Sequence, residues 1–217
     1  MSQNTETPMS QIGISSPRNT LARLLLAMIA FASFGLAALL RPANSFAQTK
    51  ATTEYQVKAA YIAGFTKFVV WPDAGQSAGP AGNSDDPFVI GVVGDDPFGP
   101  ALSEAFADAK VNGNKVAIEH FRWDQDMRKC QAIFIPPPEH KHLHAILVKL
   151  KDSSVLTISD IPQFSSEGGM IGLVFDVDRI RFEINLDAAN GAHLQISSKL
   201  LTLARSVKGH PLVRTAD

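Results

Sequence analysis

One stretch, Val155 to Ala204, decides the fold of this chain; its sequence is VLTISDIPQFSSEGGMIGLVFDVDRIRFEINLDAANGAHLQISSKLLTLA. Its first apolar run, Val155 to Ile158, predicts a buried strand. Ser159 and Asp160, followed by Pro162, end that strand in a loop at its carboxyl end. The stretch therefore opens with a strand and a loop.

Two further apolar runs follow in the same stretch. Gly168-Gly169 frees the backbone before Met170 to Phe175, and the turn Asp176-Val177-Asp178 leads into the third run. That run alternates, with Ile180, Phe182, Ile184 and Leu186 on one face and Arg179, Arg181, Glu183 and Asn185 on the other. The pattern predicts an antiparallel hairpin with one core face and one polar face, before a closing helix over about 198–207.

Upstream of this stretch, strands and helices alternate. We expect strands at 88–93, 115–121, 130–135 and 155–158, and helices at 100–109, 124–128 and 138–151. Such alternation is typical of a mainly parallel sheet with helices on its faces. The predicted fold class is therefore α/β, with an antiparallel hairpin near the C-terminus.

A helix is also expected ahead of the first strand, within residues 54–72. Its apolar stripe is Val57, Ala60-Tyr61, Gly64-Phe65 and Phe68, and Lys58 and Lys67 fall outside that stripe. Pro72 ends the helix, which we expect to pack on the sheet. Residues 73–86, rich in Gly, Ala, Ser, Asn and Asp, predict a flexible surface loop.

The N-terminus has the pattern of a secretory signal. Arg18 and Arg23 precede an apolar run at 24–40, and Ser45-Phe46-Ala47 has small residues at the two positions that a signal peptidase recognises. We expect cleavage after Ala47, which leaves a single domain at 48–210 and a flexible tail at 211–217. Uncut, the apolar run of 17 residues is just long enough to span a membrane, so a retained anchor is the alternative.

Composition excludes several classes of function. Without residues 1–47 the chain keeps 17 Lys and Arg against 20 Asp and Glu, a net charge of about −3 with His neutral. That balance argues against a nucleic-acid-binding protein. The remaining 170 residues suit one α/β domain and are too few for the two lobes of a typical solute receptor.

A single cysteine, Cys130, is present, so the chain cannot form an internal disulfide despite its predicted export. Because Cys130 opens an apolar run, we expect it to be a small buried core residue. The alternative, an intermolecular disulfide or a redox sensor, requires exposure of the thiol.

Three groups of residues are candidate sites. In Gly94-Asp95-Asp96-Pro97-Phe98-Gly99, a loop joins a strand to a helix, which is where open α/β sheets bind ligands. Two carboxylates would repel a phosphate, and no Lys-Ser/Thr follows the second glycine. We expect Asp95 and Asp96 to stabilise the turn and cap the helix, with Phe98 packed beneath them.

The other two groups are also ambiguous. His140 and His144 lie one helical turn apart, but two histidines beside Lys141 are a weak metal signal, so a solvated helix end is preferred and no metal is expected. The last group, inside the opening stretch, comprises Glu167, Arg179, Arg181, His193 and Lys199. Gly168 and Gly169 leave room there for a ligand or a partner backbone; the alternative is the polar outer face of an edge hairpin.

No nucleophile–base pair, metal triad or nucleotide-binding signature emerges from the sequence. Composition and spacing therefore support an exported, single-domain, non-catalytic binding protein without a cofactor.

Four motifs in order resemble the YfiR-like family of periplasmic regulators. They are Glu54–Ile62 with Phe65, Phe68 and Trp71-Pro72; Val92–Gly99; Cys130–Ile135; and Val155–Ala204. The resemblance covers Glu54 to about Ala204. It implies a three-layer α/β/α sandwich in the periplasm, able to dimerise, that inhibits a membrane-bound diguanylate cyclase by binding its periplasmic sensor domain.

By this resemblance the protein would lower cyclic di-GMP and biofilm formation without catalysis. The chain departs from the family in having no cysteine pairs, which puts disulfide-based redox control in doubt. The candidate contact residues for the partner or a small-molecule effector are Glu167, Gly168, Gly169, Arg179, Arg181, Asp95, Asp96 and Phe98. The alternative function is a periplasmic small-molecule receptor acting on another membrane sensor.

Overall fold

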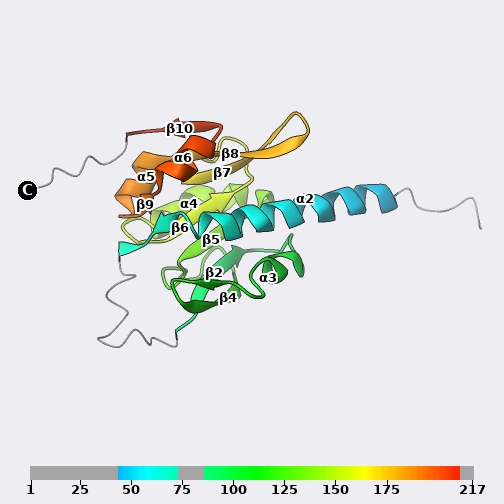
Figure 1. The fold of residues 1–217 in the computed structure, drawn as a ribbon, viewed down its shortest axis with the longest axis horizontal. Coiled ribbons are helices and arrows are strands. Elements are labelled where there is room, and N and C mark those ends of the chain that lie inside the picture. The colour runs from blue at the N-terminus through cyan, green and yellow to red at the C-terminus, as the bar shows by residue number, and fades with distance from the viewer. Residues whose placement is uncertain (1–43, 73–85, 211–217) are drawn as a thin grey trace, which may run out of the picture. The chain divides into compact units, whose positions relative to one another are not determined.

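The structure is a computed structural model that describes residues 44–72 and 86–210 (Figure 1). The predicted apolar run at 24–40, most of the surface loop at 73–86 and the tail at 211–217 lie outside the described residues. The chain divides into two compact units, Met1–Gln48 and Thr49–Asp217. Of the first unit, only the helical residues 44–48 are described, and the fold below is that of the second.

The described strands form a large sheet and a small one (Figure 1). The large sheet has eight strands in the order β10-β8-β7-β6-β5-β2-β4-β3. Its strands are β2 (Phe88–Val93), β3 (Lys110–Val111), β4 (Asn114–Phe121), β5 (Ala132–Ile135), β6 (Leu156–Ser159), β7 (Ile171–Asp176), β8 (Arg179–Asn185) and β10 (Ser206–Lys208). The small sheet pairs β1 (Val69–Val70) with β9 (Gln195–Ile196).

The large sheet is mixed but mostly parallel, as the sequence predicts. β2 is parallel to both β4 and β5, and β5–β6 and β6–β7 are also parallel. β7 and β8 form the expected antiparallel hairpin, with Phe175 opposite Ile180. The order β4-β2-β5-β6-β7 is that of a doubly wound sheet, in which the direction of strand addition reverses between β2 and β5.

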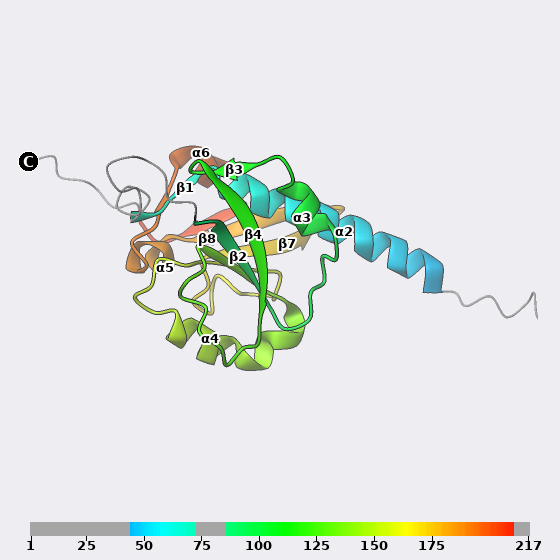
Figure 2. The same ribbon diagram turned by 90° about the horizontal axis from the view of Figure 1, so that it is seen from below.

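Helices cover both faces of this sheet. They are α2 (Asn44–Phe65), α3 (Ala101–Ala105), the 3-10 helix η2 (Pro137–His142), α4 (Leu143–Lys149), α5 (Leu186–Gly191) and α6 (Ser198–Leu203). One buried cluster joins α2, α3, α5 and α6 to the sheet, and a second joins α4 to the opposite face. Figure 2 shows α4 on the other side of β2 and β4 from α2.

The alternation predicted for β8 places its apolar residues in the core. Ile180, Phe182 and Ile184 are buried in the cluster beneath α2. Asn185, predicted on the polar face, is instead buried, because its side chain accepts a hydrogen bond from Ala188 N and donates one to Ser165 O. It thereby caps the N-terminus of α5.

The predicted stripe of α2 is displaced by one position. The buried residues are Lys58, Ala59, Ile62, Phe65 and Thr66, whereas Val57 is 42% exposed. Small and apolar residues are so frequent in this helix that periodicity alone does not select its buried face. The helix ends at Phe65, earlier than expected, and Val69–Val70 forms β1.

Four other predicted helices differ from the structure. Residues 124–128 form turns, in which Asp126 accepts a hydrogen bond from Arg128 N. The predicted helix at 138–151 is the 3-10 helix η2 followed by α4, and α3 is shorter than expected. The closing helix ends at Leu203, and the chain then extends into β10, which pairs with β8.

Candidate functional site

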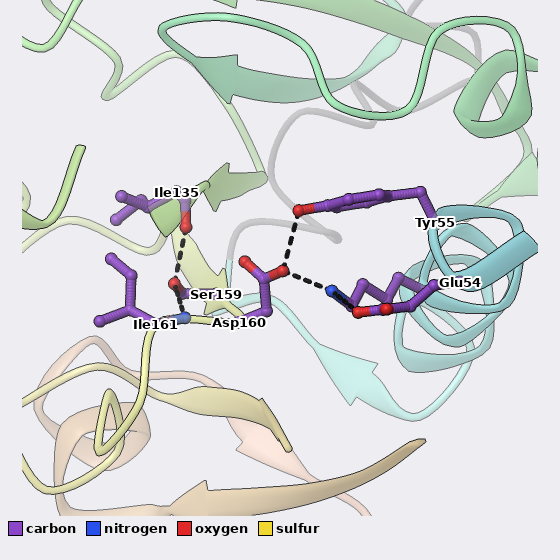
Figure 3. A network of polar contacts seen from close by, with 7 residues as sticks. Glu54, Tyr55, Ile135, Ser159, Asp160 and Ile161 are labelled. Carbon is purple, nitrogen blue, oxygen red and sulfur yellow. Dashed lines mark hydrogen bonds and ion pairs between the residues drawn. The ribbon is translucent and has the colours of Figure 1, made fainter. Parts of the chain in front are cut away.

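A buried ion pair joins α2 to the carboxyl end of β6 (Figure 3). Lys58 Nζ lies 2.5 Å from Asp160 Oδ2, and the two side chains are only 6% and 7% exposed. Lys58 also pairs with Glu54, one turn earlier on α2, at 2.6 Å. Because charged side chains are seldom buried, and then only with partners, this set is a candidate for a functional role.

The direction of Asp160 is set by its neighbour Ser159. The Ser159 hydroxyl donates to Ile135 O on β5 at 2.6 Å and accepts from Ile161 N at 2.9 Å (Figure 3). These two hydrogen bonds tie the turn after β6 to the adjacent strand. Asp160 is therefore presented from a braced backbone and not from a free loop.

Tyr55 completes the network. Its hydroxyl donates to Asp160 Oδ2 at 3.1 Å, and its ring contacts Phe98, with centroids 5.3 Å apart. Burial, together with the charge of Asp160, raises the pKa of Tyr55 well above its ordinary value. Tyr55 is therefore a hydrogen-bond donor at any physiological pH and not a proton-transfer group.

One carboxylate oxygen of this network has no hydrogen-bond partner within the described part of the chain. Asp160 Oδ1 is buried and has no hydrogen-bond partner among the described residues. Most buried polar atoms have such a partner, so an unpaired carboxylate oxygen needs an explanation.

A small cavity lies beside the ion pair. Its volume is about 140 Å³, and its lining is Glu54, Lys58, Asp160, Leu173, Val174, Phe175 and Ile180. It thus lies between the charged middle turn of α2 and the part of the β7–β8 hairpin next to its turn. Apolar side chains line one part of it and ionic groups the other.

The predicted loop after β2 is a structural turn. Asp96 Oδ1 accepts from Phe98 N at 2.7 Å, and Asp96 Oδ2 lies 3.2 Å from His120 Nε2. Phe98 is buried against Tyr55 and Phe134, as expected. Asp95 is exposed, and the N-terminus of α3 has no side-chain cap. Phe98 therefore supports the network from beneath, and the expected helix cap is absent.

The last predicted group, which contains Glu167, Arg179 and Arg181, divides between two places. Glu167 Oε2 lies 3.2 Å from His140 Nε2, and both side chains are exposed. Gly168 has a positive φ of 104°, and a side chain on Gly169 would overlap the Phe164 ring. The glycines are therefore required by the path and close packing of this loop.

Arg179 and Arg181 lie at the start of β8, on the face opposite Ile180. Ser165, from the loop that carries Glu167, donates to Glu183 on that same face. The fold thus brings the loop and the two arginines to one side of the hairpin, but no hydrogen bond or ion pair joins them within the described residues. They do not line the cavity.

The remaining predicted polar residues are dispersed. His193 is exposed with φ 59°, and Lys199 lies over the Phe68 ring at 5.6 Å. Within residues 44–72 and 86–210, no group of three or more His, Cys, Asp or Glu side chains is placed to hold a metal ion. His142 stacks on Trp123, with ring centroids 4.1 Å apart.

The point where the strand order reverses is filled by a side chain. Gly94, at the end of β2, has φ 69°, and a Cβ there would overlap the Glu139 carboxylate. Glu139 thus occupies the crevice in which doubly wound sheets commonly bind ligands. Its Oε2 atom is buried and has no partner among the described groups.

The fold and site together define a class: an α/β domain with a mostly parallel sheet, whose buried ion pair braces a helix against the strand ends. The family model described as YfiR/HmsC-like matches residues 55–205. The chain belongs to the YfiR/HmsC-like family. The resemblance inferred from the four sequence motifs is thereby confirmed.

Two solved structures resemble the chain distantly. The crystal structure of a conserved domain protein from Vibrio cholerae O1 biovar eltor str. N16961 has 15% identity and a TM-score of 0.45, covering 64% of this chain and 61% of that chain. The ABC domain in complex with L-Trp from Streptococcus pneumonia has 14% identity and a TM-score of 0.44, covering 61% of this chain and 58% of that chain. The chain thus spans about three fifths of these proteins, and similarity at this level says nothing of its ligands. No curated protein matches it.

The sequence prediction missed the ion pair and the cavity. Lys58 and Asp160 are 102 residues apart, and the helical pattern placed Lys58 outside the apolar stripe. The available signal was Glu54 four residues before Lys58, a spacing typical of an ion pair on a helix. As to the membrane, the helices that the structure describes include none long and apolar enough to cross it.

Proposed function

We propose that this protein is a periplasmic, non-catalytic regulator that binds and inhibits the periplasmic sensor domain of an inner-membrane diguanylate cyclase. Inhibition lowers cyclic di-GMP and hence biofilm formation. The observation that carries this proposal is membership of the YfiR/HmsC-like family over residues 55–205. In the structure, the buried polar groups around Lys58 and Asp160 brace α2 against the sheet.

The proposal includes the organisation of the chain. Residues 1–47 are a secretory signal cleaved after Ala47, residues 48–210 are one domain, and 211–217 are a tail. The arrangement of helices on both faces of the sheet supports describing this domain as a three-layer α/β/α sandwich, one copy of which can pair with another. The pattern of small residues before Gln48 supports export.

Inhibition requires only differential affinity. A regulator that binds the inactive arrangement of the sensor domain more tightly than the active one shifts the population toward the inactive state. The candidate contacts Glu167, Gly168, Gly169, Arg179 and Arg181 are placed on one side of the β7–β8 hairpin, and Asp95, Asp96 and Phe98 lie in the loop after β2. We retain both groups as proposed contact residues.

Deletion of the gene in its native host tests the proposal. Cyclic di-GMP and biofilm mass should rise, and the full chain should restore them, whereas a chain lacking residues 1–47 should not because it stays in the cytoplasm. Crosslinking in intact cells should capture a membrane-bound diguanylate cyclase. Unchanged cyclic di-GMP, with no membrane protein captured, would exclude the function.

A small-molecule receptor is the second candidate, favoured only by the cavity beside Lys58. That cavity, at about 140 Å³, is smaller than typical ligand pockets of about 300–1,000 Å³. Thermal shift of the purified protein against amino acids and vitamins separates the two functions, because a receptor is stabilised by its ligand.

A further inference from the structure

We propose that the cavity between α2 and the β7–β8 hairpin receives a lysine or arginine side chain of the partner protein. This inference rests on the proposed function and adds to it the position and the chemistry of one contact. It assigns the interface to the end of the sheet where Glu54, Asp160 and Phe175 meet.

The volume of the cavity is suited to a single side chain and is too small for a larger ligand. The cavity volume of about 140 Å³ is the volume that roughly five water molecules occupy in liquid water. A drug-sized ligand needs at least about twice that volume. A single long side chain that enters from a partner surface is of the right size, and the remainder of the partner stays outside.

The charges around the cavity select a cation. Glu54 and Asp160 contribute two carboxylates, against one ammonium group from Lys58, so the lining is formally negative by one charge. Glu54 is 34% exposed and is thus the accessible member of this set. An incoming ammonium or guanidinium group would balance the excess charge.

The hydrogen bonds of the network also leave an acceptor beside the cavity. Tyr55 and Lys58 both contact Oδ2 of Asp160, while Oδ1 has no partner among the described residues. A cationic side chain has several N–H donors and no acceptor, so it complements a carboxylate-rich site. An anionic or apolar side chain in the cavity would give these carboxylate oxygens fewer hydrogen bonds than water gives them.

The apolar part of the lining fits the stem of such a side chain. Leu173, Phe175 and Ile180 line the cavity, and Phe175 is 57% exposed. Lysine and arginine commonly lay their methylene groups on apolar surface while the charged end makes polar contacts. An aromatic ring beside the cation also attracts it.

The hairpin tip extends this apolar surface. Val177 is 85% exposed, and its φ of 57° is a left-handed conformation that β-branched residues seldom adopt. An exposed valine in a strained turn beside an exposed phenylalanine contributes little to the isolated fold. Both residues are suited to contact a partner around the inserted cation.

Variants of exposed residues test the interface in cells. Phe175→Ser should weaken partner binding about tenfold or more, as expected for an interface anchor, and should raise cyclic di-GMP toward the level of the deletion. Val148→Ser is the matched control, because Val148 on α4 is 56% exposed and lies on the opposite face. Glu54→Gln should weaken binding and reduce its dependence on salt. Circular dichroism confirms that each variant is folded.

These variants separate the inference from the function on which it rests. If deletion raises cyclic di-GMP but both Phe175→Ser and Glu54→Gln repress fully, the cavity is not the contact and the inference is overturned. If deletion changes nothing, the regulatory function fails, and the cavity is then judged by a direct binding measurement.

That measurement uses the purified full chain and capped amino acids. N-acetyl-lysine-N-methylamide or the arginine analogue, at millimolar concentration, should shift the NMR signals of Leu173, Phe175 and Ile180, and Glu54→Gln should reduce the shifts. The uncharged norleucine analogue is the control, and the lysine and arginine arms identify the preferred cation. Equal shifts with norleucine, or no shifts at all, would overturn the proposal.

Discussion

Replacement of Lys58 by methionine should cost the fold more than most single substitutions. Methionine keeps much of the side-chain volume but leaves Asp160 as a buried carboxylate without its cation. At 2.5 Å and an effective dielectric constant of about 20, the gross attraction of the pair is about 7 kcal/mol, which desolvation of the two ions largely offsets. Removing one partner of such a pair typically costs about 3–5 kcal/mol.

Urea unfolding followed by far-ultraviolet circular dichroism measures this cost. With a slope of about 2 kcal/mol per molar urea, a loss of about 4 kcal/mol lowers the midpoint by about 2 M. Lys129→Met is the matched control, because Lys129 pairs with Glu119 at the same 2.5 Å but both side chains are exposed. It should shift the midpoint very little.

A second substitution distinguishes an unpaired charge from lost packing. In the double variant Lys58→Met/Asp160→Asn no buried charge remains without a counter-ion, and much of the lost stability should return. A double-mutant cycle gives the coupling energy of the pair. The reasoning is refuted if Lys58→Met costs less than about 1 kcal/mol, or if the double variant is less stable than Lys58→Met alone.

Three further outcomes follow from other parts of the fold. Burial raises the pKa of the Cys130 thiol from 9.0 to about 12. The folded state therefore keeps this proton at pH values where the unfolded state loses it. The free energy of unfolding should be constant below pH 9 and should fall between pH 9 and 12. The loss at pH 10 is about 1.4 kcal/mol, and Cys130→Ala should remove that pH dependence in urea titrations at pH 7 and 10. Gly169→Ala should cost about 1–3 kcal/mol through overlap with the buried Phe164 ring, whereas Gly191→Ala, in open space, should be neutral or slightly stabilising by thermal melting; equal effects would contradict the packing argument. Asn185→Ala removes a helix cap and a buried hydrogen bond and should cost about 2 kcal/mol by urea unfolding; a change within error would contradict that role.

Local pattern predicted the centre of the fold well. The run Phe88–Val93 coincides with β2, and the turn at Asp176-Val177-Asp178 joins β7 to β8 as expected. These elements are continuous apolar runs separated by turn residues, so their pattern of apolar residues is compatible with strands alone. Their type and direction follow from the strand–helix alternation.

Elements held by distant partners were not predictable in the same way. Residues 206–208 carry no strong strand signal, and they become β10 because β8 offers a free edge. The two-residue strands β1 and β9 likewise exist only as a pair. Local sequence contains no information on such pairings.

The polar site shows the same limit. A lysine at position 58 is by propensity a solvent-exposed helical residue, and only the carboxylate of Asp160 makes its burial possible. The loop glycines and arginines of the opening stretch were recognisable from sequence, but their mutual geometry was not. Chemistry that joins positions far apart in the chain requires the tertiary structure.

The ion pair between α2 and β6 also affects the order in which the protein can fold. Its two residues are 102 positions apart, and β2, inside the sheet, also pairs with strands that follow it in the chain. Domains dominated by such distant contacts fold more slowly than those built from local ones. Lys58 gains Asp160 as a counter-ion only when the long segment between them has been brought together, so this contact cannot form from the N-terminal helix alone.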